Sequence, residues 1–175
     1  MGCDNNSAPL SFTPEMASFS NEFDFDPLRG PVKDFTQTLF NDKGEVSKRV
    51  TGTMSAEGCF DTLELHDLEA NTGVALVLDA NYYLDAETQQ QKVKLQGKCQ
   101  LAELPSAGVT WDTDDNGFVV AAHGKEMEVK YRYDADCYPL GKTNDSGEQH
   151  ISALTTPQTD RSKRMDYTSV CILDD

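Results

Sequence analysis

A period of two, in which apolar and polar residues alternate, is the dominant pattern along this chain of 175 residues. It is clearest in segment 127–133, where Met127, Val129, Tyr131 and Tyr133 alternate with charged side chains. Such alternation is typical of a strand that packs one face on a core and exposes the other to water. Three further segments show the same pattern, at residues 18–25, 62–66 and 92–95. We therefore predict a strand in each of these four segments.

The longest apolar run, residues 74–78, has the length of a strand, because a membrane-spanning helix needs about 20 apolar residues. This segment is apolar on both sides, so we expect it in the centre of a sheet. Turn-forming pairs and clusters separate the predicted strands: Asp26-Pro27, Gly30-Pro31, 41–44, 114–117 and Tyr138-Pro139. Strands at short, regular spacing predict an all-β domain, an antiparallel sheet of consecutive hairpins with little helix. A meander, an open barrel and a sandwich all fit this prediction.

Two of the turns share a local pattern. Segments 40–46 and 133–139 both place an aromatic and an acidic residue ahead of a tight turn, as the Tyr-Asp repeats of bacterial β-rich shell proteins do. Because the copies are few and irregularly spaced, we take only the local hairpin geometry from this likeness. The second segment has Cys137 at a position where glycine is usual.

Length and composition suit one folded domain. The chain is 38% hydrophobic and contains 8 Phe and 6 Tyr, which is enough apolar surface for a core. A net charge of −15 at pH 7 argues against nucleic-acid binding, since phosphates attract Lys and Arg, and against a body that lies on anionic lipid. We assign residues 1–10 to a tether and residues 11–175 to a single antiparallel β domain.

The sequence Gly2-Cys3-Asp4 matches the end of a bacterial lipobox. In this interpretation Met1 stands where a signal peptide was removed, and Cys3 carries several acyl chains, which anchor more firmly than a single chain. The alternative is an N-terminal cysteine without a special role. The lipobox interpretation also explains why the number of cysteines, five, is odd.

If Cys3 is acylated, four cysteines remain, which allow two disulfides in one of three connectivities. We prefer a bond between Cys59 and Cys99, because the first opens one predicted strand and the second closes another. A bond between Cys137 and Cys171 then follows only by elimination. Buried free thiols are the alternative. No C-x-x-C pair is present and histidine is scarce, so the cysteines do not indicate a zinc site.

Segment 112–117 resembles the first half of a calcium-binding loop. Asp112, Asp114 and Asn116 stand at positions 1, 3 and 5, and a glycine follows at position 6. Position 12, which should be a bidentate Glu, is His123, and flanking helices are missing from the pattern. Because Asn-Gly between strands is also a strong hairpin signal, we prefer a turn over a metal site.

No catalytic motif stands out in the sequence. The three histidines lie far apart, and no nucleophile-elbow, zinc-protease or phosphate-loop motif occurs. With 30 Asp and Glu, chance carboxylate pairs are certain, so a pair acting on a glycosidic bond is only an alternative. We expect no enzyme and no cofactor. Tyr82, Tyr83 and Trp111 are candidates for a ligand groove, although such aromatics in a β domain are more often core or cross-strand partners.

Five stretches resemble a known family: residues 10–16, 23–31 (FDFDPLRGP), 78–83, 96–105 (QGKCQLAELP) and 138–143. They are similar to the YnfC-type lipoproteins of enteric bacteria, and the likeness extends from residue 2 to about residue 173. Members of that family are lipoproteins of unknown function, so the resemblance implies an anchor and no particular activity. It implies Cys3 as the lipidated residue. It also supports the pairing of Cys59 with Cys99, because both fall in family-like stretches.

The resemblance also implies a role for the residues after Cys3. In enteric lipoproteins an Asp in the place of Asp4 generally retains the protein in the inner membrane, and a polar residue such as Asn5 reinforces this effect. The alternative is that Asp4 is a solvated tether residue. The sequence therefore predicts a lipid-anchored protein of the inner membrane that faces the periplasm and does not bind nucleic acid.

We expect a non-catalytic binding or accessory module that serves an envelope protein. A small envelope enzyme acting on a glycan and a ligand-sensing lipoprotein are the alternatives. Two departures from the family pattern are expected, since the sequence as given shows no signal peptide before Gly2 and family members are expected to continue past Asp175. The predicted C-terminal strand, near residues 167–172, is therefore expected to leave an open edge, as in a truncated domain.

Overall fold

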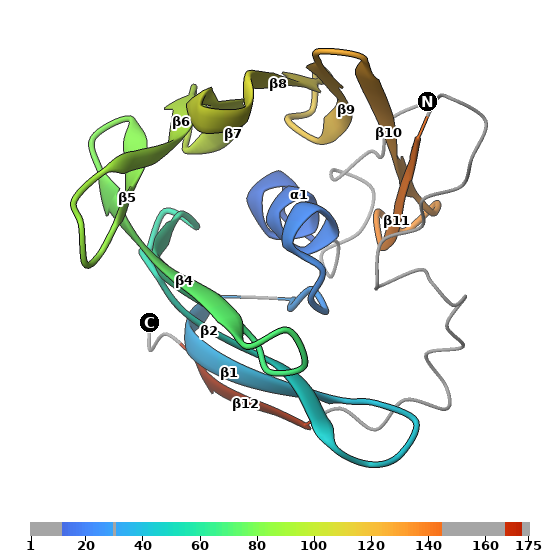
Figure 1. Cartoon of the computed structure of the whole chain (residues 1–175). Coiled ribbons are helices and arrows are strands. Elements are labelled where there is room, and N and C mark those ends of the chain that lie inside the picture. Colours follow the sequence, from blue (N-terminus) through green and yellow to red (C-terminus); the bar gives the residue numbers. More distant parts are fainter. Residues whose placement is uncertain (1–11, 30, 145–166, 173–175) are drawn as a thin grey trace.

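One long antiparallel sheet curls around the helix α1 (Figure 1). The computed structural model describes residues 12–29, 31–144 and 167–172. Its elements, in chain order, are α1 (Pro14–Phe23), β1 (Val32–Phe40), β2 (Val46–Met54), β3 (Phe60–Asp67), β4 (Thr72–Asp79), β5 (Tyr82–Asp85), β6 (Gln91–Gln96), β7 (Gln100–Leu104), the 3-10 helix η1 (Pro105–Ala107), β8 (Val109–Thr113), β9 (Val119–Gly124), β10 (Met127–Tyr133), β11 (Pro139–Asn144) and β12 (Tyr167–Ile172).

The strands lie in the order β11-β10-β9-β8-β7-β6-β5-β4-β3-β2-β1-β12. Strands β1 to β11 are therefore consecutive hairpins, and β12 pairs antiparallel with β1. This confirms the predicted all-β fold and selects the meander with an open sheet. Within the described residues β11 and β12 are the two edge strands, so the expected open edge at the C-terminal strand is present.

The predicted strand at residues 18–25 is wrong, because most of this segment belongs to the helix α1. Phe19 and Phe23 are four residues apart, so they share a helix face as well as a strand parity. The deciding features precede the segment: Thr13 caps the helix by accepting from the Met16 N–H, and Pro14 occupies the first turn. Within the described residues no helix is long and apolar enough to cross a membrane.

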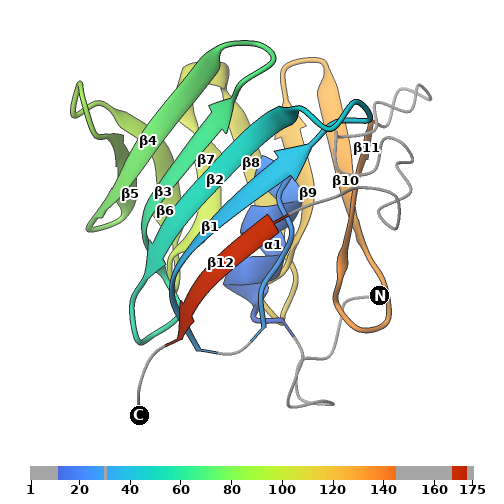
Figure 2. The ribbon, with the colours of Figure 1, turned by 90° about the horizontal axis from the view of Figure 1, so that it is seen from below.

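Aromatic side chains fill the space between α1 and the concave face of the sheet. Phe19 stacks on Phe60, with 4.9 Å between ring centroids, and meets Tyr83 edge-on at 5.7 Å. Phe25, just after the helix, is fully buried and packs against Phe35. Figure 2 shows α1 behind β1 and β2, on the side toward which the sheet curls. The helix therefore covers the concave face, while the convex face is left to solvent.

The run at residues 74–78 forms most of β4, an inner strand with β3 and β5 as neighbours, as predicted. Its two faces differ in burial, however. Leu76 points to the core and is 4% exposed, whereas Val77 on the convex face is 38% exposed. Apolar residues on both sides of this strand therefore do not indicate burial on both sides, because α1 covers only one face of the sheet.

Four hairpin turns share one hydrogen-bond pattern. The N–H of the first residue donates to the carbonyl of the fifth, and the N–H of the fourth donates back to the carbonyl of the first. A side-chain oxygen of the first residue also accepts from the fifth N–H. The first residues are Asn41, Ser55, Asp114 and Asp134. The shared geometry predicted for 40–46 and 133–139 and the turn predicted at 114–117 are thus confirmed.

The fourth residue of each turn has a positive φ, which favours glycine. These residues are Gly44, Gly58, Gly117 and Cys137, with φ of 78°, 89°, 90° and 67°. Cys137 adopts this conformation although it has a side chain, and it is 1% exposed, next to Phe12 and Phe118. Burial of its side chain therefore offsets the backbone strain at this turn.

A disulfide joins Cys59 to Cys99, with 5.9 Å between their Cα atoms. This confirms the preferred pairing. The bond ties the β2–β3 turn to the β6–β7 turn, which belong to the same end of the sheet because turns of consecutive hairpins alternate between its two ends. The side chain of Cys171 lies outside the described residues, so its pairing with Cys137 stays a prediction.

Gly117→Ala should destabilise the protein more than Gly44→Ala, although both glycines hold the same position of the same turn. A Cβ at Gly44 meets nothing within 4 Å, so this change adds only left-handed backbone strain, about 1 kcal/mol. A Cβ at Gly117 would lie 2.4 Å from Nε2 of Gln100 and 3.2 Å from Cβ of Pro14. Because the Gln100 amide ends a flexible side chain that can move aside, the contact with Pro14 decides, and overpacking there should add about 1 kcal/mol to the loss. Urea unfolding measures both changes, and equal losses would contradict the contact between this turn and the start of α1.

Replacing both bonded cysteines, Cys59→Ser with Cys99→Ser, should lower the free energy of unfolding by up to about 4 kcal/mol, because the bond closes a loop of 40 residues in the unfolded chain. Urea unfolding with and without reductant measures the loss. Reductant should weaken the wild-type protein by more than it weakens the double variant. The pairing is wrong if peptide mapping of oxidised material finds free thiols at both positions.

Candidate functional site

Glu22, at the end of α1, binds three side chains of the sheet. Its Oε1 accepts hydrogen bonds from Nε1 of Trp111 and from the hydroxyl of Tyr131, each over 2.8 Å. Its Oε2 forms an ion pair with Nζ of Lys142 on β11. Burial, followed by the charge of Glu22, raises the pKa of Tyr131 above its ordinary value, so the phenol stays protonated as a donor. This cluster fastens the helix to β8, β10 and the edge strand β11.

The three aromatic residues proposed for a ligand groove do not line a common groove. Tyr83 is 1% exposed, and its hydroxyl donates to the carbonyl of Phe60 over 2.7 Å. Trp111 is 5% exposed and is engaged by Glu22. Tyr82 precedes Tyr83 in the same strand, so its side chain lies on the opposite, convex face. Tyr83 and Trp111 are core residues, which was the alternative interpretation.

The calcium-loop candidates serve the β8–β9 hairpin instead. Oδ1 of Asp114 accepts from the N–H groups of Asn116 and Phe118, over 2.9 and 3.0 Å. Asp112 lies on β8, and its carboxylate binds His123. In the part of the chain that the structure describes, no group of three or more His, Cys, Asp and Glu is placed to hold a metal ion.

His123 bridges two carboxylates on the convex face. Its Nε2 lies 2.5 Å from Oδ2 of Asp112 on β8, and its Nδ1 lies 2.7 Å from a carboxylate oxygen of Glu128 on β10. The hydrogen bonds to Glu128 and then to Asp112 raise the pKa of His123. The sequence pattern did not predict this cluster, because the three positions meet only in the register of three neighbouring strands. The available signal was that all three residues occupy solvent-facing positions of their strands.

Glu15 is a buried carboxyl group at the start of α1. Its side chain is 6% exposed, and its nearest cation is Nζ of Lys98, 3.9 Å from Oε1. Burial raises the pKa of Glu15, and the charge of Lys98 opposes this effect. A raised pKa is the property of a general acid, but glycoside hydrolysis needs a second carboxylate about 5–9.5 Å away. The described ion partner of Glu15 is a lysine.

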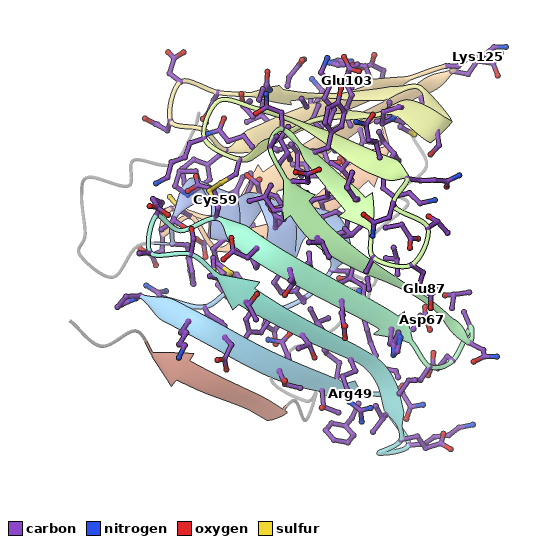
Figure 3. All side chains as sticks on the ribbon, turned by 90° about the vertical axis from the view of Figure 1, so that its left-hand side faces the viewer. Arg49, Cys59, Asp67, Glu87, Glu103 and Lys125 are labelled. Carbon is purple, nitrogen blue, oxygen red and sulfur yellow. A yellow bond between two sulfur atoms is a disulfide. The ribbon has the colours of Figure 1, made fainter. Side chains whose placement is uncertain are left out.

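Two hollows lie at opposite ends of the described structure. The larger, of 360 Å³, lies between the β3–β4 and β5–β6 hairpins. Its lining residues are His66, Asp67, Leu68, Asn71, Thr72, Gly73, Val74, Ala75, Asp85 and Glu87. Figure 3 shows Asp67 and Glu87 at this end of the strands and Cys59 at the other. The smaller hollow, of 230 Å³, lies near the start of α1, where Met16 and Met54 line it.

The pKa of His123 should be above 6.5 in the wild-type protein and lower in a variant with Asp112→Asn and Glu128→Gln, because both carboxylates favour the charged imidazole. A raised folded-state pKa means that the contribution to stability is complete below about pH 6.5 and is lost as pH rises through the raised pKa. An NMR titration of the ring measures the pKa, and urea unfolding on either side of it measures the stability. An equal His123 pKa in both proteins would contradict the bridge.

The residues predicted for lipidation and sorting, Cys3, Asp4 and Asn5, lie outside the described residues, so their roles stay predictions. Comparison with known proteins nevertheless covers them. The model of UPF0257, described as an uncharacterised protein family, matches residues 1–175. No solved structure matches the chain.

Curated relatives from Salmonella carry the name UPF0257 lipoprotein YnfC. The protein of Salmonella typhi is 70% identical over 174 residues, which are 99% of this chain and 74% of that protein. Those of Salmonella paratyphi B and Salmonella dublin are 70% and 69% identical over the same shares. A family match over the whole chain, with relatives this similar, shows that the protein belongs to the uncharacterised UPF0257 family.

Proposed function

We propose that this protein is a membrane-anchored, non-catalytic binding or accessory module that serves an envelope protein at the periplasmic face of the inner membrane. The name lipoprotein carried by its relatives supports an anchor at Cys3 and a location in the envelope. Asp4 and Asn5 support the choice of the inner membrane, because they match the residues that retain enteric lipoproteins there.

The filled concave face carries the non-catalytic part of the proposal. A site for a small molecule or for catalysis is ordinarily a concave pocket with a few converging polar groups. Here α1 and its aromatic side chains occupy the concave side of the sheet. The polar side chains around Glu22 bind Glu22 and so hold the helix, which leaves them unavailable to a ligand. The convex face and the two ends of the sheet are then the surfaces that remain for recognition.

A glycan-cleaving enzyme is the second candidate, and one observation favours it. The pKa of Glu15 is raised by burial, and a raised carboxyl pKa is a property of a general acid. Two observations argue against this role. The ion partner of Glu15 is Lys98, and the lining of the nearby smaller hollow includes only one carboxylate, the exposed Glu57. The ligand-sensing alternative has lost its proposed groove, since Tyr82 lies on the convex face.

Crosslinking of the lipidated, full-length protein in intact cells tests the proposal. We expect one reproducible envelope partner that Cys3→Ser loses, because the unanchored module no longer stands where the partner works. Glu87→Lys and Glu57→Lys form a matched pair, since each reverses one exposed acid at a different end of the sheet. A partner that depends on one of these two surfaces would support specific recognition.

An assay of glycan cleavage on the same protein distinguishes the glycan-cleaving enzyme from the non-catalytic module. The non-catalytic proposal is overturned if the protein cleaves a glycan and Glu15→Gln abolishes the cleavage while the variant keeps the wild-type unfolding midpoint. Cleavage that Glu15→Gln leaves intact would point to contamination or to another carboxylate, and a partner found by crosslinking would then still support the binding module.

A further inference from the structure

The chain enters the folded domain at a fixed point. Phe12 is 3% exposed and packs with Ala17, Phe118 and Cys137, while the Arg29 guanidinium lies 4.2 Å from the centre of its ring. This contact between the residue before the cap and the fourth helical residue is a hydrophobic staple, which fixes the direction of entry. Any pull on the N-terminal residues is therefore applied at Phe12, beside the β8–β9 and β10–β11 turns.

This entry point lies at one end of the sheet. We call that end the helix-start rim and define it by the turns 55–59, 80–81, 97–99, 114–118 and 134–138. The helix-end rim consists of the turns 41–45, 68–71, 86–90, 105–108 and 125–126. Lys98 and Gly117 of the helix-start rim approach Glu15 and Pro14. At the other rim Lys48 Nζ, near the β1–β2 turn, donates to the carbonyls of Phe23 and Asp24.

Charge does not distinguish the two rims. The turns of the helix-start rim carry Glu57, Asp114, Asp115, Asp134 and Asp136 with Lys98, a net charge of −4. Those of the helix-end rim carry Asp42, Glu45, Glu69, Glu87 and Glu126 with Lys43 and Lys125, a net charge of −3. Both rims are repelled by anionic lipid, so neither would lie on such a bilayer through its own charge. The position of the anchor must then decide which rim is nearer to the membrane.

Covalent geometry limits how far the body stands from its anchor. Cys3 and Phe12 are nine chain steps apart, so a lipid on Cys3 keeps Phe12 within about 32 Å of the bilayer surface. The strand β2 has nine residues and connects the two rims, which places them about 30 Å apart. The length of the tether is thus comparable to the distance between the two rims. The rims can therefore lie at measurably different distances from the bilayer.

We propose that the anchored protein stands with its helix-start rim, including the disulfide, toward the membrane and presents its helix-end rim, with the 360 Å³ hollow, to partners in the periplasm. This orientation rests on the proposed anchor at Cys3. The hydrophobic staple at Phe12 places the tether at the helix-start rim, so this rim lies nearer to the membrane. The acidic turns of this rim repel anionic lipid and prevent direct contact with it. The strands then run away from the bilayer, so a partner approaching from the aqueous side meets the β3–β4 and β5–β6 hairpins first.

Energy transfer in reconstituted vesicles tests the orientation. The lipidated, full-length protein receives a donor dye through a noncanonical amino acid at Glu57 or at Lys43, which are exposed turn residues at the two ends of β2. Vesicles of phosphatidylethanolamine and phosphatidylglycerol carry the acceptor on a headgroup. We expect the transfer efficiency from position 57 to exceed that from position 43 at least twofold. Equal efficiencies, or a higher efficiency from position 43, would overturn the proposed orientation.

Two controls distinguish a failure of the proposed orientation from a failure of the proposed anchor at Cys3. Cys3→Ser should abolish transfer from both positions, and if transfer persists, the body contacts lipid directly and the proposal fails. Nine Gly and Ser residues inserted after Asn5 should lower the transfer from position 57. An unchanged transfer in that variant would mean that surface contacts, rather than the tether, hold the body, which also overturns the proposal. If Cys3→Ser detaches the protein but both positions transfer equally, the anchor stands and only the orientation is wrong.

Discussion

The fold depends on filling the concave side of an open, curling sheet. An apolar inner face with Phe60, Tyr83 and Trp111 cannot face water, and the described strands β11 and β12 do not close the sheet into a barrel. The helix α1 covers this inner face, because its residues Met16 and Phe19 belong to one core cluster with the inner residues of the sheet. The cap at Thr13, the packing of Phe12 and the ion pair of Glu22 all fix this helix in place.

The two ends of α1 are held by different kinds of interaction. The start is held by packing, through Phe12 and the second apolar cluster, and by the turn at Gly117. The end is held by polar contacts, since Glu22 binds the sheet and Lys48 donates to the last carbonyls of the helix. A polar group buried without partners destabilises a protein, so the complete pairing of the Glu22 carboxylate is what allows it to lie inside. The disulfide adds a covalent tie between two turns of the end where the helix begins.

The alternating pattern predicts the sheet but not the helix that shapes it, and the reason is physical. The convex face is in water, so strands such as β10 keep a clear alternation that needs no knowledge of the fold. Phe19 and Phe23 fit both periods, and only the cap at Thr13 with Pro14 separates a helix from a strand. Apolar residues on both faces of β4 suggested more burial than one covering helix provides.

The candidate sites also divide into those that the sequence could predict and those that it could not. The pairing of Cys59 with Cys99 was predictable, because cysteines at strand ends meet when hairpins stack side by side. The bridge of His123 between two carboxylates was not, since it requires the register of β8, β9 and β10. Tyr83 and Trp111 were misleading as ligand candidates because the element that buries them, α1, had been interpreted as a strand.

The route by which the chain enters the domain has a mechanical consequence for a tethered protein. A tether attached to an edge strand would pull along a row of single hydrogen-bonded pairs, which separate one after another. Here the tether joins the helix that the whole sheet surrounds, so a pull on it is resisted by the packing of Phe12 and Phe19 together. An anchor on the N-terminal residues therefore loads the packed helix and not an edge strand, which fits a protein whose relatives are named lipoproteins.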